Sequence, residues 1–238
     1  MFYLSFLSLW CSERPKILSP NVLSLVREIG NVINKLKEIT GVKERRYAND
    51  NLNSSDLGYL AAEKAIKDAN IDKESIDYII VAHNFGDVKP TSDQSDMLPC
   101  LAARVKHLLK IKNPKCVAYD ILFGCPGWVE GVIQANSFIK SGIAKKCLVI
   151  GSETLSRVVD KFDRDSMIYA DGSGAIILES NNSDDSGILS HNSATYTFEG
   201  ENEFIYYGSS YNPKLSKDSN QKYIKMQGRK VYEFALFH

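Results

Sequence analysis

The stretch CVAYDILFGCPGWVEG, residues 116–131, decides how this chain folds. Residues 116–121 are mostly apolar, and their length is typical of a strand buried on both faces of a sheet. Pro126 follows after a short turn, and proline suits the first position of a helix because its missing N–H has no partner there. The stretch therefore predicts a buried strand that turns sharply into a helix over residues 127–141.

Cys125 stands in the turn between this strand and this helix. Directly before Pro126 it would be the N-cap residue, so its sulfur would face free backbone N–H groups and the positive end of the helix dipole. Such surroundings lower the pKa of a thiol and raise its thiolate fraction. The layout is similar to the strand–nucleophile–helix elbow of hydrolases. We predict a nucleophile at Cys125; the alternative is a cysteine that only fills a tight turn.

The remaining elements follow from the spacing of apolar residues, which recur at three and four residues in helices and run continuously in buried strands. Helices are predicted over 21–37, 54–70, 99–110 and 127–141, and strands over 78–82, 116–121, 147–151, 174–179 and, less clearly, 187–198. This alternation predicts an α/β protein with a parallel or mixed sheet covered by helices. Residues 170–175 (ADGSGA) predict a tight glycine turn, and residues 211–221 a long loop.

Composition excludes several classes of function. The 238 residues carry 29 basic and 29 acidic side chains, so the net charge of zero gives no electrostatic footprint for DNA or RNA. The apolar window Phe2–Trp10 is too short for a membrane span. No basic residue precedes this window and no small-residue cleavage site follows it, which argues against a secretory signal.

Five cysteines occur at positions 11, 100, 116, 125 and 147, without any CxxC pair. This argues against a zinc or thioredoxin-like site, and the odd, scattered set indicates reduced thiols in a cytoplasmic protein. We expect four of them to be packing residues. Of the four histidines, His83 follows strand 78–82 and is predicted to be a loop or packing residue, and none is a convincing base for a nucleophilic cysteine.

Several short motifs occur in a fixed order over residues 40–235. They are Thr40-Gly41-Val42, Ile76–Ala82, Tyr119-Asp120 with Cys125-x-Gly127, Gly151-x-Glu153-x-x-Ser156, Asp163-Arg164, Asp171-Gly172-x-Gly174 and Met226-x-Gly228-x-x-Val231-Tyr232. Together they resemble the 3-oxoacyl-[acyl-carrier-protein] synthase III family of the thiolase-like superfamily.

The resemblance implies a thiolase-like αβαβα layered fold made of two similar halves, of which this sequence holds mainly the first. It also implies a homodimer. On this basis residues 1–39 form an atypical amino-terminal segment and residues 40–225 the thiolase-like amino-terminal domain. Residues 226–238 would then begin a truncated carboxy-terminal domain.

The same resemblance implies an activity. Cys125 would accept an acyl group as a thioester from acyl-CoA or acyl-ACP, without a cofactor or a metal. Malonyl-ACP would lose CO2, and the resulting carbanion would attack the thioester in a Claisen condensation of fatty acid or related biosynthesis. The acyl carrier protein is therefore an expected partner.

Two further residues match family positions. Arg164 corresponds to a position near the nucleotide of the acyl donor, and Leu98 to the bulky residue that lines the partner subunit's acyl pocket. Lys35 and Ile39 stand where the family often clamps the adenine between Trp and Arg. The family's catalytic His and Asn belong to the second half, which this sequence lacks. Two alternatives therefore stay open: an incomplete fragment that acts only as a dimerisation or acyl-binding module, and a cysteine hydrolase with a similar elbow.

Overall fold

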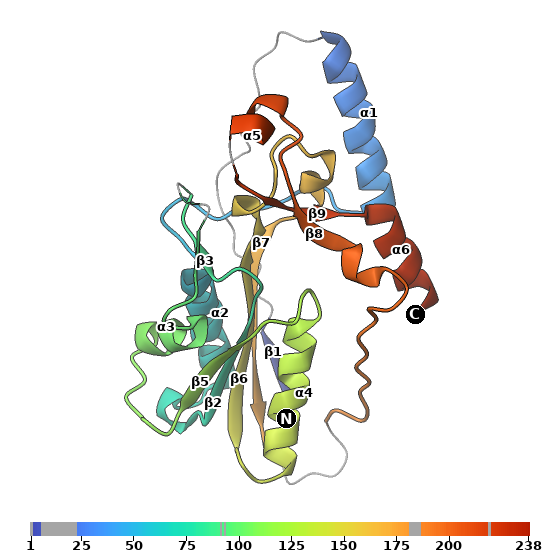
Figure 1. Ribbon diagram of the computed structural model, residues 1–238. Helices are drawn as coiled ribbons and strands as arrows, with labels where there is room; N and C mark the ends of the chain where they lie inside the picture. The colour runs from blue at the N-terminus through green and yellow to red at the C-terminus, as the bar shows by residue number, and fades with distance from the viewer. Residues whose placement is uncertain (1, 6–22, 91, 93, 181–186, 219) are drawn as a thin grey trace.

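The computed structural model describes residues 2–5, 23–90, 92, 94–180, 187–218 and 220–238 (Figure 1). Its centre is a five-stranded mixed sheet in the order β1-β7-β6-β2-β5. The strands are β1 (Phe2–Ser5), β2 (Tyr78–Ala82), β5 (Val117–Ile121), β6 (Lys146–Thr154) and β7 (Asp171–Glu179). Strand β2 pairs in parallel with both β5 and β6, whereas β7 pairs antiparallel with β6 and β1. The predicted α/β class with a mixed sheet is confirmed.

Helices cover both faces of this sheet. Helices α2 (Ser54–Ala69) and α3 (Leu101–Leu108) pack on one face, and α4 (Gly127–Lys140) packs on the other, as Figure 1 shows. Successive residues of β2 alternate between the two cores, with Ile79 in the first and Ile80 in the second. Both faces of β2 and β6 are buried, which explains why these strands are continuous apolar runs rather than alternating ones. The prediction that the strand over 116–121 is buried as well is wrong, because β5 is the edge of the sheet and its residues are partly or fully exposed.

Smaller elements surround this layered centre. They are α1 (Leu23–Thr40), the hairpin of β3 (Asp87–Val88) and β4 (Ser95–Asp96), the hairpin of β8 (Ile205–Gly208) and β9 (Tyr223–Met226), α5 (Pro213–Asp218) and α6 (Gly228–Phe237). Figure 1 shows α1, α5, α6 and the β8–β9 hairpin beyond one end of the central sheet. None of the described helices combines the length and the apolar content of a bilayer crossing.

Three further predictions about local structure are wrong. Residues 187–198 form no strand, and Phe198 in this segment is 99% exposed, so no core is available to support one. Residues 171–174 are not a turn but the first part of β7, where Gly174 pairs with Gly151 through main-chain groups alone. The predicted loop 211–221 contains the short helix α5, and the β8–β9 hairpin that flanks it was not predicted.

Helix α2 begins at the predicted residue, but its cap is Asn53. The backbone N–H of Asn53 donates to Asp56 Oδ2 at 2.8 Å. Ser54 and Ser55, the first two residues of α2, are buried, and the Ser55 hydroxyl donates to Asp87 Oδ2 at 2.6 Å. Ser55 therefore ties the start of α2 to the β3–β4 hairpin, whereas Ser54 ties it to β6 through a hydrogen bond with the Thr154 hydroxyl at 3.1 Å.

Helix α4 lies close against the sheet because Gly131 has no side chain. A Cβ atom at this position would lie 2.9 Å from Val149 Cγ1, inside the normal contact distance. We expect Gly131→Ala to lower the free energy of unfolding by about 1 kcal/mol, because overpacking costs ~1–3 kcal/mol and the gain in helix propensity is ~1 kcal/mol. Urea unfolding measures the difference.

Gly30→Ala in α1 is the matched control, because nothing lies within 4 Å of a Cβ atom at that position. This variant should be as stable as the wild type or more stable, by up to ~1 kcal/mol. Equal stabilisation by the two substitutions would contradict the close packing of α4 on β6.

Candidate active site

The parallel strands β5, β2 and β6 end at the same edge of the sheet. Ala82 of β2 is aligned with Ile121 of β5 on one side and with Gly151 of β6 on the other. Ligand and catalytic sites of α/β proteins gather at the carboxyl ends of such strands. Polar and reactive side chains lie at this edge: His83 and Asn84 follow β2, Cys125 follows β5, and Glu153 is in the last part of β6, beyond Gly151.

Cys125 lies exposed in the turn that joins β5 to α4. Gly124 adopts a left-handed backbone with φ of 69°, which L-residues with a side chain rarely adopt, and the Gly127 N–H donates to the Gly124 carbonyl at 3.0 Å. The predicted N-cap position is wrong by one residue, because Pro126 is the N-cap and α4 begins at Gly127. Cys125 therefore lies between the left-handed Gly124 and the N-cap residue Pro126.

The elbow is held against the end of β2. A Cβ atom on Gly127 would lie 3.3 Å from Ala82 Cβ, so the start of α4 approaches the strand as closely as its backbone permits. Trp128 comes next and lies over β6, where a Cβ atom on Gly151 would be 3.3 Å from Trp128 Cβ. The turn with Cys125 is therefore fixed between two strand ends by close packing.

The other described cysteines are less accessible. Cys116 and Cys147 are buried and Cys100 is partly buried, whereas Cys125 is exposed. Burial raises the pKa of the Cys147 thiol to about 12, so this group stays protonated at neutral pH. The predicted packing role is confirmed for these three residues, and Cys11 lies outside the described residues.

His83 is buried, and both of its ring nitrogens have partners. Nδ1 accepts the Gly86 N–H at 3.0 Å, which leaves Nε2 to donate to Asp120 Oδ2 at 2.8 Å. The Asp120 carboxylate also accepts the N–H groups of Leu101 and Ala102 at the start of α3, at 2.7 and 2.8 Å. His83 thus has the packing role that the sequence predicted for it. It joins the loop after β2 to the strand that leads to Cys125.

Glu153 is a buried carboxyl group with one free oxygen. Its Oε2 accepts the backbone N–H and the side-chain amide of Asn84 at 2.7 and 2.9 Å, while Oε1 has no partner among the described residues. Burial raises the pKa of Glu153, and the hydrogen bonds from Asn84 only partly oppose that effect. Glu153 belongs to the motif Gly151-x-Glu153-x-x-Ser156 that the sequence analysis identified. The spacing of that motif did not indicate that the carboxyl group is buried beside Asn84.

Two more buried polar atoms near this edge lack a partner in the described part of the chain: Trp128 Nε1 and the Tyr169 hydroxyl. Burial raises the pKa of Tyr169 to about 12, and Cys125 adds to the increase, so the two side chains lie within electrostatic range. Buried polar groups normally have partners, which leaves these atoms available to a ligand or to water. Sequence reasoning identified neither residue.

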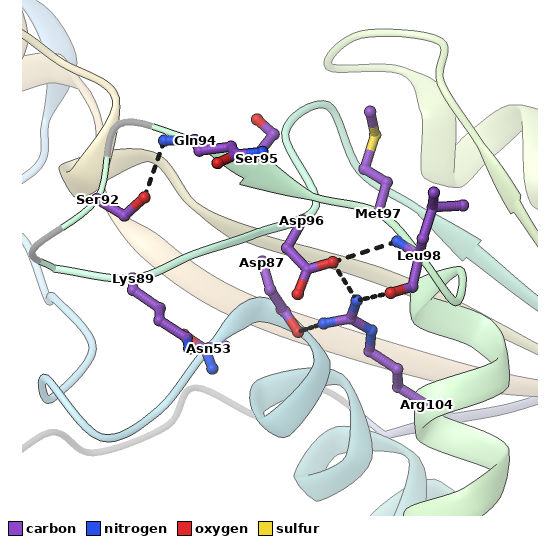
Figure 2. Close-up of a pocket in the computed structure, with 10 residues that line it drawn as sticks. All are labelled: Asn53, Asp87, Lys89, Ser92, Gln94, Ser95, Asp96, Met97, Leu98 and Arg104. Atoms are coloured by element: carbon purple, nitrogen blue, oxygen red, sulfur yellow. Dashed lines mark hydrogen bonds and ion pairs between the residues drawn. The ribbon is translucent and has the colours of Figure 1, made fainter.

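Leu98 lies at the end of a cavity of about 410 Å³ that Cys125 does not line. This residue is 87% exposed, and its carbonyl accepts a hydrogen bond from Arg104 Nη2 at 2.9 Å. The same guanidinium group pairs with Asp87 at 2.7 Å and with Asp96 at 2.6 Å, as Figure 2 shows. Arg104 therefore holds the segment that presents Leu98 to solvent.

Arg164 opens a short 3-10 helix, Arg164–Ile168. Its side chain is 71% exposed, and its Nε lies 3.3 Å from Asp165 Oδ1. The structure thus places Trp128 and Tyr169 near Cys125, Glu153 beside Asn84 at the same edge of the sheet, and Arg164 and Leu98 on other exposed segments. Within the described residues, no three His, Cys, Asp or Glu side chains come together as a metal ion would require.

The raised pKa of Glu153 predicts a dependence of stability on pH. The folded chain holds this proton more tightly than the unfolded chain, so the contribution to stability is present below the unfolded pKa of about 4.3 and is lost as pH rises through the folded pKa. Glu153→Gln has no proton to lose and keeps an oxygen for Asn84. We therefore expect its stability relative to the wild type to increase as pH rises from about 4 to about 7.

Urea unfolding of both proteins across this pH range measures the effect. Glu199→Gln, at an exposed position, serves as the control and should show a difference that is constant with pH. A pH-independent difference for Glu153→Gln would contradict the raised pKa.

Comparison with known proteins agrees with this geometry. Residues 119–197, which include the elbow, match the family model described as 3-Oxoacyl-[acyl-carrier-protein (ACP)] synthase III. Beta-ketoacyl-[acyl-carrier-protein] synthase III 1 of Vibrio vulnificus (strain YJ016) is 38% identical over 198 residues, which cover 83% of this chain and 57% of the relative. The synthase III of Ehrlichia canis (strain Jake) is 37% identical over 203 residues, with the same coverage of 83% and 57%.

A solved structure shows the same relationship. The beta-ketoacyl-[acyl carrier protein] synthase III of Thermus thermophilus superposes with a TM-score of 0.62 at 31% identity, over 83% of this chain and 57% of that chain. The fold and the elbow thus define a thiolase-like α/β protein. Within this class the chain belongs to the 3-oxoacyl-[acyl-carrier-protein] synthase III family, as its motifs predicted. It spans 57% of the length of these relatives.

Proposed function

We propose that this chain is an acyltransferase that forms an acyl thioester at Cys125 and condenses it with malonyl-ACP in fatty acid or related biosynthesis. One observation carries the proposal: Cys125 is an exposed thiol, fixed in an elbow at the carboxyl edge of the sheet, inside the region that matches the synthase III family. A thiolate is both a good nucleophile and a good leaving group, so it suits an acyl group that is held briefly.

The chemistry has two steps. The Cys125 thiolate attacks the carbonyl carbon of acyl-CoA or acyl-ACP, a new S–C bond forms, and the donor leaves as its thiolate. Malonyl-ACP then loses CO2, and the electron pair of the broken C–C bond attacks the Cys125 thioester, which expels the cysteine sulfur. The unpartnered N–H of Trp128 and hydroxyl of Tyr169 are hydrogen-bond donors at this edge, where an acyl carbonyl would need them.

Acylation can be tested directly on the 238-residue chain. After incubation with acetyl-CoA or acetyl-ACP, we expect mass spectrometry to find one acetyl group on the peptide that contains Cys125. Cys125→Ala should lose it, and Cys100→Ala, at a partly buried cysteine, should keep it. If neither the wild-type chain nor a full-length relative carries the acetyl group after this incubation, the proposed chemistry is overturned. Acylation without any 3-oxoacyl product would instead favour the acyl-binding module.

A second copy of this chain is the proposed partner at the edge strand β5. Strand β5 ends the sheet, and exposed apolar residues lie along it and directly after it, at Val117, Leu122 and Phe123. An apolar edge with unpaired backbone groups favours pairing with another strand. Leu98 is exposed just before α3, which binds β5 through Asp120, so it is placed to reach such a partner. The free thiols support the proposed cytoplasmic location.

The proposed homodimer predicts the effect of a charge on this edge. Val117→Lys should shift the chain from dimer to monomer in sedimentation equilibrium, because it would place a charge in the shared surface. Ile143→Lys replaces an apolar side chain that is also exposed but lies in the turn after α4, and it should leave the dimer intact. A wild type that is monomeric at tens of micromolar would contradict the proposal.

A further inference from the structure

The elbow at Cys125 lacks a backbone donor that such a turn usually supplies. In the strand–nucleophile–helix elbow of hydrolases, the N–H of the residue after the nucleophile stabilises the negative oxygen that forms when a carbonyl is attacked. Here that residue is Pro126, which has no N–H. The next N–H, on Gly127, donates to the Gly124 carbonyl at 3.0 Å. Neither of the two residues that follow Cys125 therefore offers a free backbone N–H to an acyl group.

Tyr169 comes to the same edge of the sheet from β7. This strand runs antiparallel to β6, and its first residue, Asp171, is aligned with Thr154 at the carboxyl end of β6. Tyr169 lies two residues before Asp171, so the chain brings it to the edge where the strand before Cys125 also ends. Burial raises the pKa of Tyr169 to about 12, and the negative charge of Cys125 adds to the increase, which agrees with this placement.

The backbone on both sides of Tyr169 is fixed by contacts with a distant segment. The carbonyl of the preceding residue, Ile168, accepts a hydrogen bond from Arg45 Nε at 3.2 Å. Two residues after Tyr169, the Asp171 N–H donates to the Arg46 carbonyl at 2.9 Å. Tyr169 is therefore held between two anchored neighbours, and its side chain starts from a defined position.

The Tyr169 hydroxyl is the part of this side chain that the fold leaves unsatisfied. Its oxygen is buried and has no hydrogen-bond partner among the described residues. A buried hydroxyl costs free energy unless it is hydrogen-bonded, whereas a phenylalanine ring would fill the same space without that cost. With a pKa of about 12 the hydroxyl keeps its proton at neutral pH, so it is available as a donor.

Trp128 carries the other unpartnered donor at this edge, and its surroundings differ. Its ring packs against the core between α4 and the sheet, and its Cβ lies close over Gly151 of β6. The described part of Tyr169's surroundings includes no such core cluster. Packing therefore accounts for the Trp128 side chain, whereas the hydroxyl of Tyr169 calls for a bound group.

We propose that Tyr169 is a catalytic residue whose hydroxyl donates a hydrogen bond to the carbonyl oxygen of the acyl group that reacts with Cys125. As the sulfur attacks, the π electrons of the carbonyl move onto this oxygen, and the hydroxyl stabilises the negative charge without giving up its proton. When the donor thiolate leaves, the electron pair returns and the C=O bond forms again. This inference rests on the proposed function, because it assumes that Cys125 takes an acyl group.

Tyr169→Phe tests this role because it removes one oxygen and keeps the ring. With acetyl-CoA and the 238-residue chain, we expect the maximal rate of Cys125 acylation to fall about a hundredfold, the usual effect of losing one oxyanion donor. The half-saturating concentration should stay within about twofold. Tyr206→Phe, at an exposed tyrosine of β8, should react like the wild type. Because the lost hydroxyl is unsatisfied, Tyr169→Phe should melt at the wild-type temperature or above it.

Two further measurements separate catalysis from a structural role. Alkylation of Cys125 by iodoacetamide displaces iodide and puts no negative charge on a carbonyl oxygen, so Tyr169→Phe should be alkylated at the wild-type rate. In the ¹³C-acetyl thioester at Cys125, infrared spectroscopy should find the C=O stretch at a higher wavenumber in Tyr169→Phe, because the hydrogen bond to that oxygen is lost. Equal losses in acylation and alkylation would reduce Tyr169 to a structural role and overturn the inference.

The outcomes also distinguish failure of this inference from failure of the proposed function. If Tyr169→Phe is acylated as fast as the wild type, or if Trp128→Phe shows the loss instead, only the role of Tyr169 is overturned. If the wild type takes no acetyl group although iodoacetamide alkylates Cys125, the proposed function fails and the inference falls with it.

Discussion

The in-register parallel pairing of β5, β2 and β6 is the constraint on which the rest of this structure depends. It buries the apolar strands β2 and β6, and partly β5, between helices on both faces, and the removal of that surface from water is the main source of stability. The same pairing brings three strand ends to one edge. Cys125 and Glu153 are separated in sequence, and both lie at this edge because β5 and β6 run in the same direction.

Polar groups at that edge serve to fix loops. Asp120 accepts hydrogen bonds from His83 and from the first N–H groups of α3, and Glu153 accepts two from Asn84. Each carboxylate thereby connects a strand to a loop that starts from a neighbouring strand. One buried atom each on Glu153, Trp128 and Tyr169 has no hydrogen-bond partner in the described part of the chain, which is the pattern expected where a substrate completes the hydrogen bonding.

A second anchoring system lies outside the sheet. The β8–β9 hairpin binds the segment 158–165 through main-chain pairing and through the buried ammonium group of Lys225. A buried ion pair adds little net stability. It permits few alternative geometries, however, because moving one partner leaves the other charge unpaired in an environment of low dielectric constant. The elbow is thus fixed by apolar packing and close backbone approach, whereas the segment with Arg164 is fixed by charge.

The sequence by itself determined the α/β class, the four main helices, the central strands and the elbow at Cys125, because these depend on local periodicity and on proline and glycine at particular positions. It also indicated that His83 is a packing residue. Tertiary structure decided what depends on partners distant in the chain: the incorporation of residues 171–174 into β7, the β8–β9 hairpin, the orphaned Tyr169 hydroxyl and the pairing of Lys225 with Asp160. Local patterns carry no information on these contacts, because burial and electrostatic pairing are set by residues that only folding brings together.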